Sequence, residues 1–169
     1  MAKNLIFING PMGVGKSATC RQLLDLLQPA AYLDGDWCWM MKPWTVNART
    51  IAMAQENIVF VLRQYLEVRE IETVVFGWVM HQQEIVTGLL DALPLDGVRV
   101  HVFSLICSPD ALKKRIIADV SAGIRSEDIV QRSLERLPLY APMPWPKIDV
   151  SQISAAAAAD HIANSVRDL

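Results

Sequence analysis

The sequence predicts an α/β fold of three layers, in which helices cover both faces of a five-stranded parallel sheet. Five short apolar runs alternate with stretches of helical periodicity along the chain. A glycine-rich loop joins the first run to the first helix, and the run at residues 98–106 is the longest and most apolar. Strands that alternate with helices pair in parallel through right-handed crossovers. Because 169 residues suffice for a substantial core, we expect a single domain over residues 1–169.

The expected strands are short runs of apolar or β-branched residues bounded by polar residues, glycine or proline. In chain order they are residues 5–8, 30–33, 73–76, 98–106 and 148–150. The second run ends at Asp34-Gly35-Asp36, and the third ends at Gly77-Trp78. The length of the fourth run favours a central position in the sheet, with both faces covered.

The expected helices carry apolar residues at helical spacing between these strands. In chain order they are residues 18–28, 47–70, 82–93, 108–120, 126–137 and 154–167. Ser108-Pro109-Asp110 is typical of a helix start, with a capping serine and a first-turn proline. Prolines at positions 138, 142, 144 and 146 favour an extended connection after the fifth helix.

Composition and charge exclude several classes of partner. No apolar run approaches the roughly 20 residues that cross a membrane, and no signal-peptide pattern precedes the first strand. A net charge of −2 gives no electrostatic footprint for nucleic acid. The three cysteines show no metal-like spacing, which is typical of reduced thiols. We therefore expect a cytoplasmic protein without a membrane or nucleic-acid partner.

The loop after the first strand matches the phosphate-binding (Walker A) pattern G-x-x-x-x-G-K-[ST], as Gly10-Pro11-Met12-Gly13-Val14-Gly15-Lys16-Ser17. Glycine backbone can turn tightly and bring N–H groups against phosphate oxygens, and the following helix adds a partial positive charge. Lys16 can reach the β- and γ-phosphates, and the Ser17 hydroxyl can ligate Mg²⁺. Thr19, two residues after Ser17, is also expected to bind the nucleotide. The sequence therefore predicts binding of a nucleoside triphosphate.

Three classes of nucleotide-binding protein do not fit. Motor-type and remodelling ATPases carry a carboxylate after a second apolar strand, whereas the candidates here end in Phe76-Gly77-Trp78 and Leu105-Ile106-Cys107. The Asn-Lys-x-Asp and Asp-x-x-Gly elements of GTPases do not occur. A dinucleotide-binding fingerprint fails because Gly13-Val14-Gly15 lacks the third glycine.

The loop, the element order and Leu33-Asp34-Gly35-Asp36 resemble the small phosphate-loop kinases: shikimate, gluconate and adenylylsulfate kinases and, more distantly, adenylate kinase. The resemblance spans nearly the whole chain and implies ATP and Mg²⁺ as cofactors. It implies that Asp34 holds the magnesium hydration shell and that Asp36 contacts the acceptor hydroxyl and takes its proton. The alternative is that the two aspartates cap a turn.

The same resemblance places the acceptor in residues 34–80. Arg49, at a helix start, is the candidate grip for an anionic group, and Gly77-Trp78 would line the pocket. A solvated arginine is the alternative for Arg49. Trp37 and Trp78 belong to a set of tryptophans that suggests a flat or apolar substrate held by stacking. Core packing or a dimer contact would also explain the set, and is the better explanation for any single member; the members are Trp37, Trp39, Trp44 and Trp78.

The resemblance implies a lid over residues 115–135. Leu112-Lys113-Lys114-Arg115 is similar to an adenylate kinase segment whose arginine lies near the adenine. A second arginine is expected four residues later, but Asp119 occupies that position, and Arg125 is the candidate replacement. Asp149 and Ser151 match the adenine-side loop.

These features together predict a kinase that moves the γ-phosphoryl group of Mg–ATP to a hydroxyl or phosphate of a small acceptor. Lys16, Asp36, Arg115 and Arg125 are the candidate catalytic residues. A nucleoside or nucleotide kinase is one alternative, which base stacking on tryptophan would suit. A nucleotide-binding regulatory module with little turnover is another. Both a monomer and a homodimer are compatible with the sequence.

Overall fold

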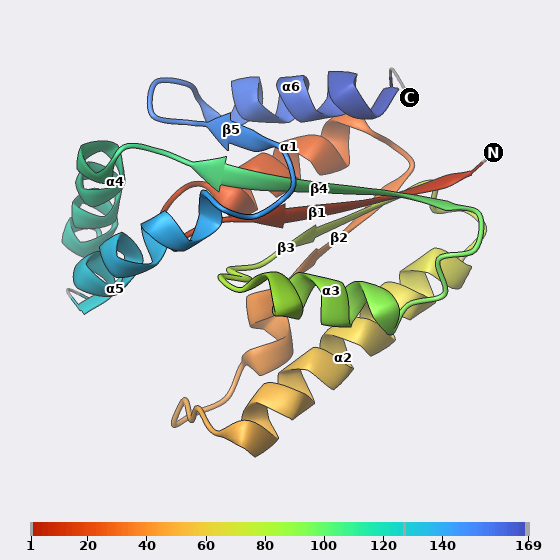
Figure 1. Cartoon of the computed structure of the whole chain (residues 1–169), viewed down its shortest axis with the longest axis horizontal. Helices are drawn as coiled ribbons and strands as arrows, with labels where there is room; N and C mark the ends of the chain where they lie inside the picture. Colours follow the sequence, from red (N-terminus) through yellow and green to blue (C-terminus); the bar gives the residue numbers. More distant parts are fainter. Residues whose placement is uncertain (1, 127, 168–169) are drawn as a thin grey trace.

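The computed structural model, which describes residues 2–126 and 128–167, contains a five-stranded parallel sheet in the order β2-β3-β1-β4-β5. The strands are β1 (Lys3–Asn9), β2 (Ala30–Asp34), β3 (Thr73–Gly77), β4 (Val98–Ile106) and β5 (Lys147–Asp149). Helices flank both faces of the sheet (Figure 1). The predicted three-layer α/β/α fold is therefore confirmed.

The helices lie close to their expected positions. They are α1 (Lys16–Leu26), α2 (Ala48–Glu67), α3 (Gln83–Asp91), α4 (Pro109–Ser121), α5 (Asp128–Arg136) and α6 (Ala155–Arg167), with 3₁₀ turns η1 (Gly35–Trp39) and η2 (Leu137–Tyr140). Helices α1 and α6 cover one face of the sheet, α2 and α3 cover the other, and α4 and α5 lie beyond the carboxyl ends of the strands (Figure 1). None of the helices described is long and apolar enough to span a bilayer.

Capping side chains fix where two helices begin. The Ser108 hydroxyl accepts a hydrogen bond from the Ala111 N–H at 3.2 Å, which confirms the predicted start of α4. Asn47 and Thr50 form a reciprocal capping box at the start of α2. The proline-rich connection is less extended than expected, because Pro138 lies at the first turn of η2, where its missing N–H costs nothing.

The expectation that β4 is central and covered on both faces is wrong for its first half. The central strand is β1, which pairs with both β3 and β4. The short strand β5 pairs only with residues 104–106 of β4. In the first half of β4, Arg99 and Val100 are exposed, whereas the buried positions lie mainly in the second half.

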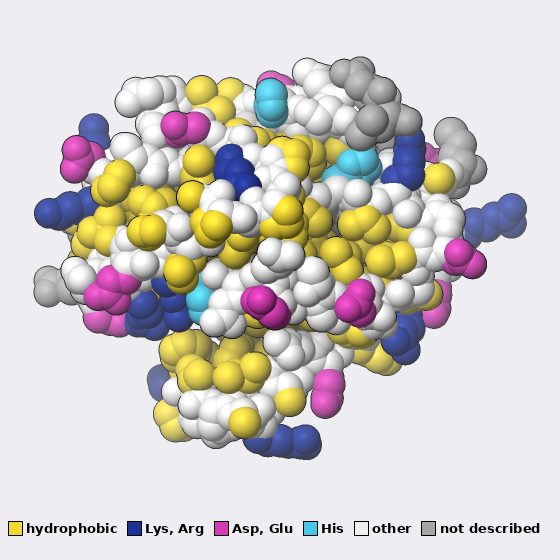
Figure 2. Space-filling model, in the orientation of Figure 1, with side chains coloured by type: hydrophobic (Ala, Val, Ile, Leu, Met, Phe, Trp, Pro, Cys, Tyr) yellow, Lys and Arg dark blue, Asp and Glu magenta, His cyan; other side chains and the backbone are white. Residues whose placement is uncertain are grey.

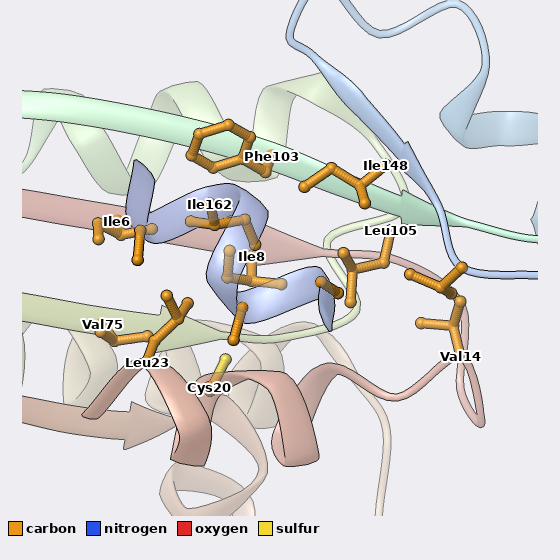
Figure 3. Close-up of a cluster of buried hydrophobic side chains, with 14 of the residues drawn as sticks. Ile6, Ile8, Val14, Cys20, Leu23, Val75, Phe103, Leu105, Ile148 and Ile162 are labelled. Atoms are coloured by element: carbon orange, nitrogen blue, oxygen red, sulfur yellow. The ribbon is translucent and has the colours of Figure 1, made fainter. Parts of the chain in front are cut away.

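Two apolar cores hold the layers together. One lies between the sheet and the α1–α6 pair, where Ile6 and Ile8 of β1 meet Leu23 of α1 and Ile162 of α6 (Figure 3). The other lies between the sheet and the α2–α3 pair, where Phe7 and Phe76 pack edge to face at 4.8 Å. Because β1 sends alternate side chains into both cores, its carboxyl end is held firmly where the glycine loop begins.

Gly35, the first residue of η1, is in close contact with the ring of Trp78, which follows β3. A Cβ at position 35 would lie 2.3 Å from Trp78 Cγ. A side chain there would displace the indole, since real Cβ atoms do not approach ring carbons so closely.

We predict opposite stability effects for two glycine substitutions. Gly35→Ala is expected to destabilise the protein by about 1–3 kcal/mol, because the added methyl group displaces Trp78. Gly88→Ala, in α3, meets no atom within 4 Å and is expected to stabilise by about 0.5–1 kcal/mol through lower chain entropy. Urea unfolding of both variants measures the difference. Equal stability of Gly35→Ala and the wild type would contradict the packing argument.

Candidate active site

A cavity of about 390 Å³ lies at the carboxyl edge of the sheet, where α/β proteins of this class bind ligands. The glycine loop and the first turn of α1 form its floor. Asp34 and Asp36 line it after β2, and Trp78 lines it after β3. Charged side chains of α4 and of the segment after it complete the wall. The cavity therefore brings together charged and polar side chains from distant parts of the sequence.

Two glycines set the shape of the loop. Gly13 has φ +83°, and a Cβ there would lie 2.5 Å from Ile116 Cγ1 of α4, so the loop packs directly against that helix. Gly15 has φ +110° and precedes α1 without a side-chain cap. The first N–H groups of α1 thus remain available to an anion at its amino end, where the helix dipole also favours negative charge.

Lys16 is held inside its own loop. Its Nζ donates a hydrogen bond to the Pro11 carbonyl oxygen at 2.8 Å. Burial lowers the pKa of Lys16 to about 8, with Asp36 partly opposing and Arg125 adding to the effect. The Lys16 ammonium therefore lies inside the loop, where it has lost part of its hydration free energy. A bound anion would offset that loss.

Ser17 and Asp34, the two expected magnesium ligands, are in direct contact. The Ser17 hydroxyl donates to Asp34 Oδ2 at 2.8 Å, and the Tyr32 hydroxyl donates to the same oxygen at 2.8 Å. Asp34 also caps η1, since Oδ1 accepts from the Asp36 N–H at 3.1 Å. The capping role and the proposed metal role of Asp34 are thus compatible.

This oxygen pair fits a magnesium ion in its chemistry. Mg²⁺ in nucleotide sites is held by one or two protein oxygens together with phosphate oxygens and water. Within residues 2–126 and 128–167, no group of three or more His, Cys, Asp or Glu side chains could hold a metal by itself. A metal at Ser17 and Asp34 would accordingly arrive with the phosphates.

Asp36 faces the same cavity and is oriented by Trp78, whose Nε1–H donates to Asp36 Oδ1 at 3.1 Å. Burial raises the pKa of Asp36, and the neighbouring Asp34 carboxylate raises it further. The hydrogen bond from Trp78 and the charge of Lys16 act in the opposite direction. A carboxylate with a raised pKa is a better proton acceptor than an ordinary aspartate.

The arginines of the expected lid reach the cavity. Arg115 Nη1 donates to the Val14 carbonyl oxygen at 3.1 Å, and Nη2 donates to the carbonyl of Val150. Arg125 forms an ion pair with Asp119 at 2.9 Å, and both side chains line the cavity. Both arginines of the expected lid therefore lie at the cavity, and each already has a partner within the chain.

Other predicted residues lie outside the cavity lining. Asp149 and Ser151 bond to each other after β5, and Thr19 is buried within α1. Trp37 is exposed and packs edge to face on Tyr32. Gly77 is buried at the end of β3, and Arg49 is exposed in the first turn of α2. Three residues of the glycine loop are buried and also absent from the lining: Gly10, Pro11 and Val14.

Sequence reasoning missed four residues at the site. Arg21 and Ala18 of α1 line the cavity, and Ser133 of α5 donates to the Met12 carbonyl oxygen at 3.0 Å. Tyr32 supports Asp34 as described above. Strand alternation places Tyr32 on the same face as Asp34, and helical spacing places Arg21 one turn after Ser17, so the sequence could have indicated Tyr32 and Arg21. The Ser133 contact joins residues 121 positions apart, and no sequence pattern indicates it.

Comparison with known proteins agrees with this fold. A family model described as an AAA domain matches residues 6–132. No curated protein matches the sequence. Among solved structures, the chain is similar to the tunicamycin resistance protein of Deinococcus radiodurans, with 19% identity, a TM-score of 0.66 and coverage of 97% of this chain and 95% of that chain.

Two solved kinases have similar folds. A gluconokinase from Sinorhizobium meliloti is 18% identical, with a TM-score of 0.66 and coverage of 98% of this chain and 96% of that chain. A shikimate kinase from Acinetobacter baumannii, solved in complex with shikimate, is 21% identical, with a TM-score of 0.65 and coverage of 99% and 94%. The resemblance to small phosphate-loop kinases is therefore confirmed at the level of the fold.

Trp78→Phe is expected to raise the pKa of Asp36. The substitution keeps a ring against Gly35 but removes the Nε1–H that stabilises the ionised carboxylate. Titration of the Asp36 carboxyl ¹³C chemical shift measures the change. Trp44→Phe, at an exposed ring, is the control and should leave that titration in place. An unchanged Asp36 pKa in Trp78→Phe would show that the indole does not hold the carboxylate.

Proposed function

This chain belongs to the AAA domain family, and we propose, from its site and from the kinases that share its fold, that it is an ATP-dependent small-molecule kinase. It would transfer the γ-phosphoryl group of Mg–ATP to a hydroxyl or phosphate of a compact acceptor. The observation that carries the proposal is the joining, in one cavity, of the glycine loop and Lys16 with Asp34 and Asp36. A phosphate cradle and a carboxylate that can face the acceptor are the two parts that transfer to an acceptor oxygen requires.

The nucleotide half of the site follows from the loop. Backbone N–H groups of the loop and of the first turn of α1 would bind the phosphate oxygens, and Lys16 would exchange the Pro11 carbonyl for them. Ser17 and Asp34 would hold Mg²⁺, which supplies charge neutralisation on the phosphates when bound. Arg125, anchored by Asp119, would face the transferred group.

The acceptor half depends on Asp36. Its carboxylate would accept the proton of the attacking hydroxyl while Trp78 fixes its orientation. Phosphoryl transfer relies mainly on alignment and charge neutralisation, so a carboxylate held at one geometry by an indole suits the task. The raised pKa of Asp36 favours proton acceptance as the oxygen attacks.

A nucleotide-binding module with little turnover is the second candidate. It is favoured by one observation: Arg115 already bonds to backbone carbonyls and Arg125 is already paired with Asp119. Arginines that meet the transferred phosphate contribute large rate factors in related chemistry. If neither guanidinium leaves its present partner, turnover would be slow.

Asp36→Asn distinguishes the two candidates. In a kinase it should lower kcat by roughly 10²–10⁴-fold and leave the ATP dissociation constant nearly unchanged, because the lost group acts on the acceptor. Phosphoryl transfer to an acceptor library, followed by mass spectrometry, measures the rate, and calorimetry measures ATP affinity. Lys16→Met is the companion variant, which should abolish transfer. Full transfer by Lys16→Met would exclude the kinase proposal.

Nucleotide binding should take up a proton at alkaline pH. One pH unit above its free-state pKa of about 8, Lys16 is mostly neutral, whereas a bound polyphosphate favours the ammonium and raises that pKa. Calorimetry of Mg–ATP binding in two buffers of different ionisation enthalpy measures the uptake. Lys16→Arg keeps a permanent charge and should abolish it. Equal binding enthalpies of the wild-type protein in both buffers would contradict the role of Lys16.

A further inference from the structure

Aromatic side chains extend outward from both carboxylates of the site. From Asp36 the series runs through Trp78 to Trp39, with ring centroids 6.4 Å apart, and on to Trp44, a further 5.7 Å away. From Asp34 a second, shorter series runs through Tyr32 to Trp37. The first series, Trp78, Trp39 and Trp44, is called the tryptophan arm below. It begins in the cavity and ends in solvent.

The outer part of this arm is not buried in the core. Trp44 is 58% exposed and Met40 is 82% exposed, although both are large apolar side chains. Figure 2 shows hydrophobic side chains gathered over η1 and the loop that follows it. Exposed apolar surface of this kind marks a place where a ligand or partner is bound.

Trp39 carries a hydrogen-bond donor without a partner. Its indole Nε1 is buried and has no hydrogen-bond partner among the residues described. A buried donor without a partner is costly, and native proteins usually satisfy such groups. The middle of the tryptophan arm therefore offers one N–H donor beside flat apolar faces.

We propose that the phosphoryl acceptor is an uncharged molecule that joins an aromatic ring to a hydroxyl group, nucleosides included, and that the tryptophan arm binds its ring. The inference rests on the proposed kinase function and names the substrate class of the same site. The ring packs against Trp39 and Trp44, an acceptor atom of the molecule takes the Trp39 N–H, and the hydroxyl lies at Asp36. Trp78 lines the cavity, and Trp39 and Trp44, which lie outside its lining, continue from Trp78 through ring contacts.

The charges around the arm favour a neutral acceptor over an anionic one. Residues 37–46 carry a single charged side chain, Lys42. Arg49 is exposed in the first turn of α2 and does not line the cavity. Arg136 lies close enough to His81 to lower the pKa of that imidazole, but it too is absent from the cavity lining. The cations that line the cavity, among them Lys16 and Arg125, would be engaged by the polyphosphate in the proposed arrangement. The acceptor would then face Asp34 and Asp36, beside which a carboxylate or phosphate is disfavoured.

The transfer step balances without a further reactant. The acceptor oxygen forms a bond to the γ-phosphorus, and the bond from that phosphorus to the bridging oxygen of ATP breaks. Asp36 takes the hydroxyl proton, and ADP leaves with the electron pair of the broken bond. The products are ADP and the phosphate ester of the aromatic alcohol.

Two matched probe sets test the substrate class. Uridine and phenyl β-glucoside carry a ring without charge, ribose and methyl β-glucoside lack the ring, and uridine monophosphate and phenyl β-glucuronide add an anion. With Mg–ATP and the full chain, ATP-dependent mass gain is expected for at least one uncharged ring-bearing probe. It should exceed that of its ringless and anionic counterparts at least tenfold.

Variants then locate the ring. Trp44→Leu removes an exposed ring and should raise the KM of the ring-bearing probe roughly three- to tenfold, with the ATP dissociation constant unchanged. Trp39→Phe keeps a ring but removes the unpaired N–H, and should also raise KM. Phe60→Leu removes another exposed ring, on α2 outside the arm, and should change neither constant.

Several outcomes would overturn the inference. They are preferred transfer to a ringless or anionic probe, failure of every uncharged ring-bearing probe to react, and equal KM values in Trp44→Leu and the wild type. A dimer or vesicle binding that Trp44→Leu abolishes would assign the arm to another occupant. Transfer to an anionic acceptor would leave the kinase proposal intact, whereas absent ATP binding would remove the kinase proposal itself.

Discussion

The hydrogen bond between Ser17 and Asp34 is the contact on which the arrangement of the site depends. It joins the first turn of α1, which follows β1, to the end of β2, although β3 lies between these two strands in the sheet. Gly77, the last residue of β3, pairs with Ile8 on one side and with Asp34 on the other. A Cβ at position 77 would lie 2.8 Å from Cys20 Sγ of α1. Helix α1 can therefore cross the end of β3 only because that position lacks a side chain.

Partial desolvation also affects the two central charges of the site in the free protein. It lowers the pKa of Lys16 and raises the pKa of Asp36, so in both residues the charged form is less favourable than in water. Desolvated charges become more stable when partners of opposite sign are added with good geometry. A polyphosphate would supply that partner to Lys16 and a proton from an acceptor would supply it to Asp36. The cavity thus favours an anionic polyphosphate beside Lys16 and a neutral hydroxyl group beside Asp36.

The sequence revealed the local parts of this site and missed those that depend on distant contacts. Gly10 to Ser17 could be predicted because the motif, its strand and its helix are contiguous. Asp34 and Asp36 followed from their place after a strand and from the resemblance. The hydrogen bond from Trp78 to Asp36 spans 42 positions and depends on the missing side chain at Gly35, so spacing could not indicate it. The exposure of Arg99 and Val100 in the first half of β4 could not be foreseen either, because it depends on which parts of the sheet the distant helices cover.

The ion pair between Asp119 and Arg125 shows how a departure from a family pattern can be compensated within the fold. Asp119 stands where the resemblance expects an arginine, and by itself would place a negative charge beside the phosphates. Arg125 lies just beyond the break at the end of α4 and reaches back to this carboxylate at 2.9 Å. The pair is about one-third exposed on each side, so solvent weakens it. A guanidinium held by a weak partner can rotate toward a stronger anion at small cost, and an aspartate at position 119 thereby keeps an arginine near the cavity without binding it tightly.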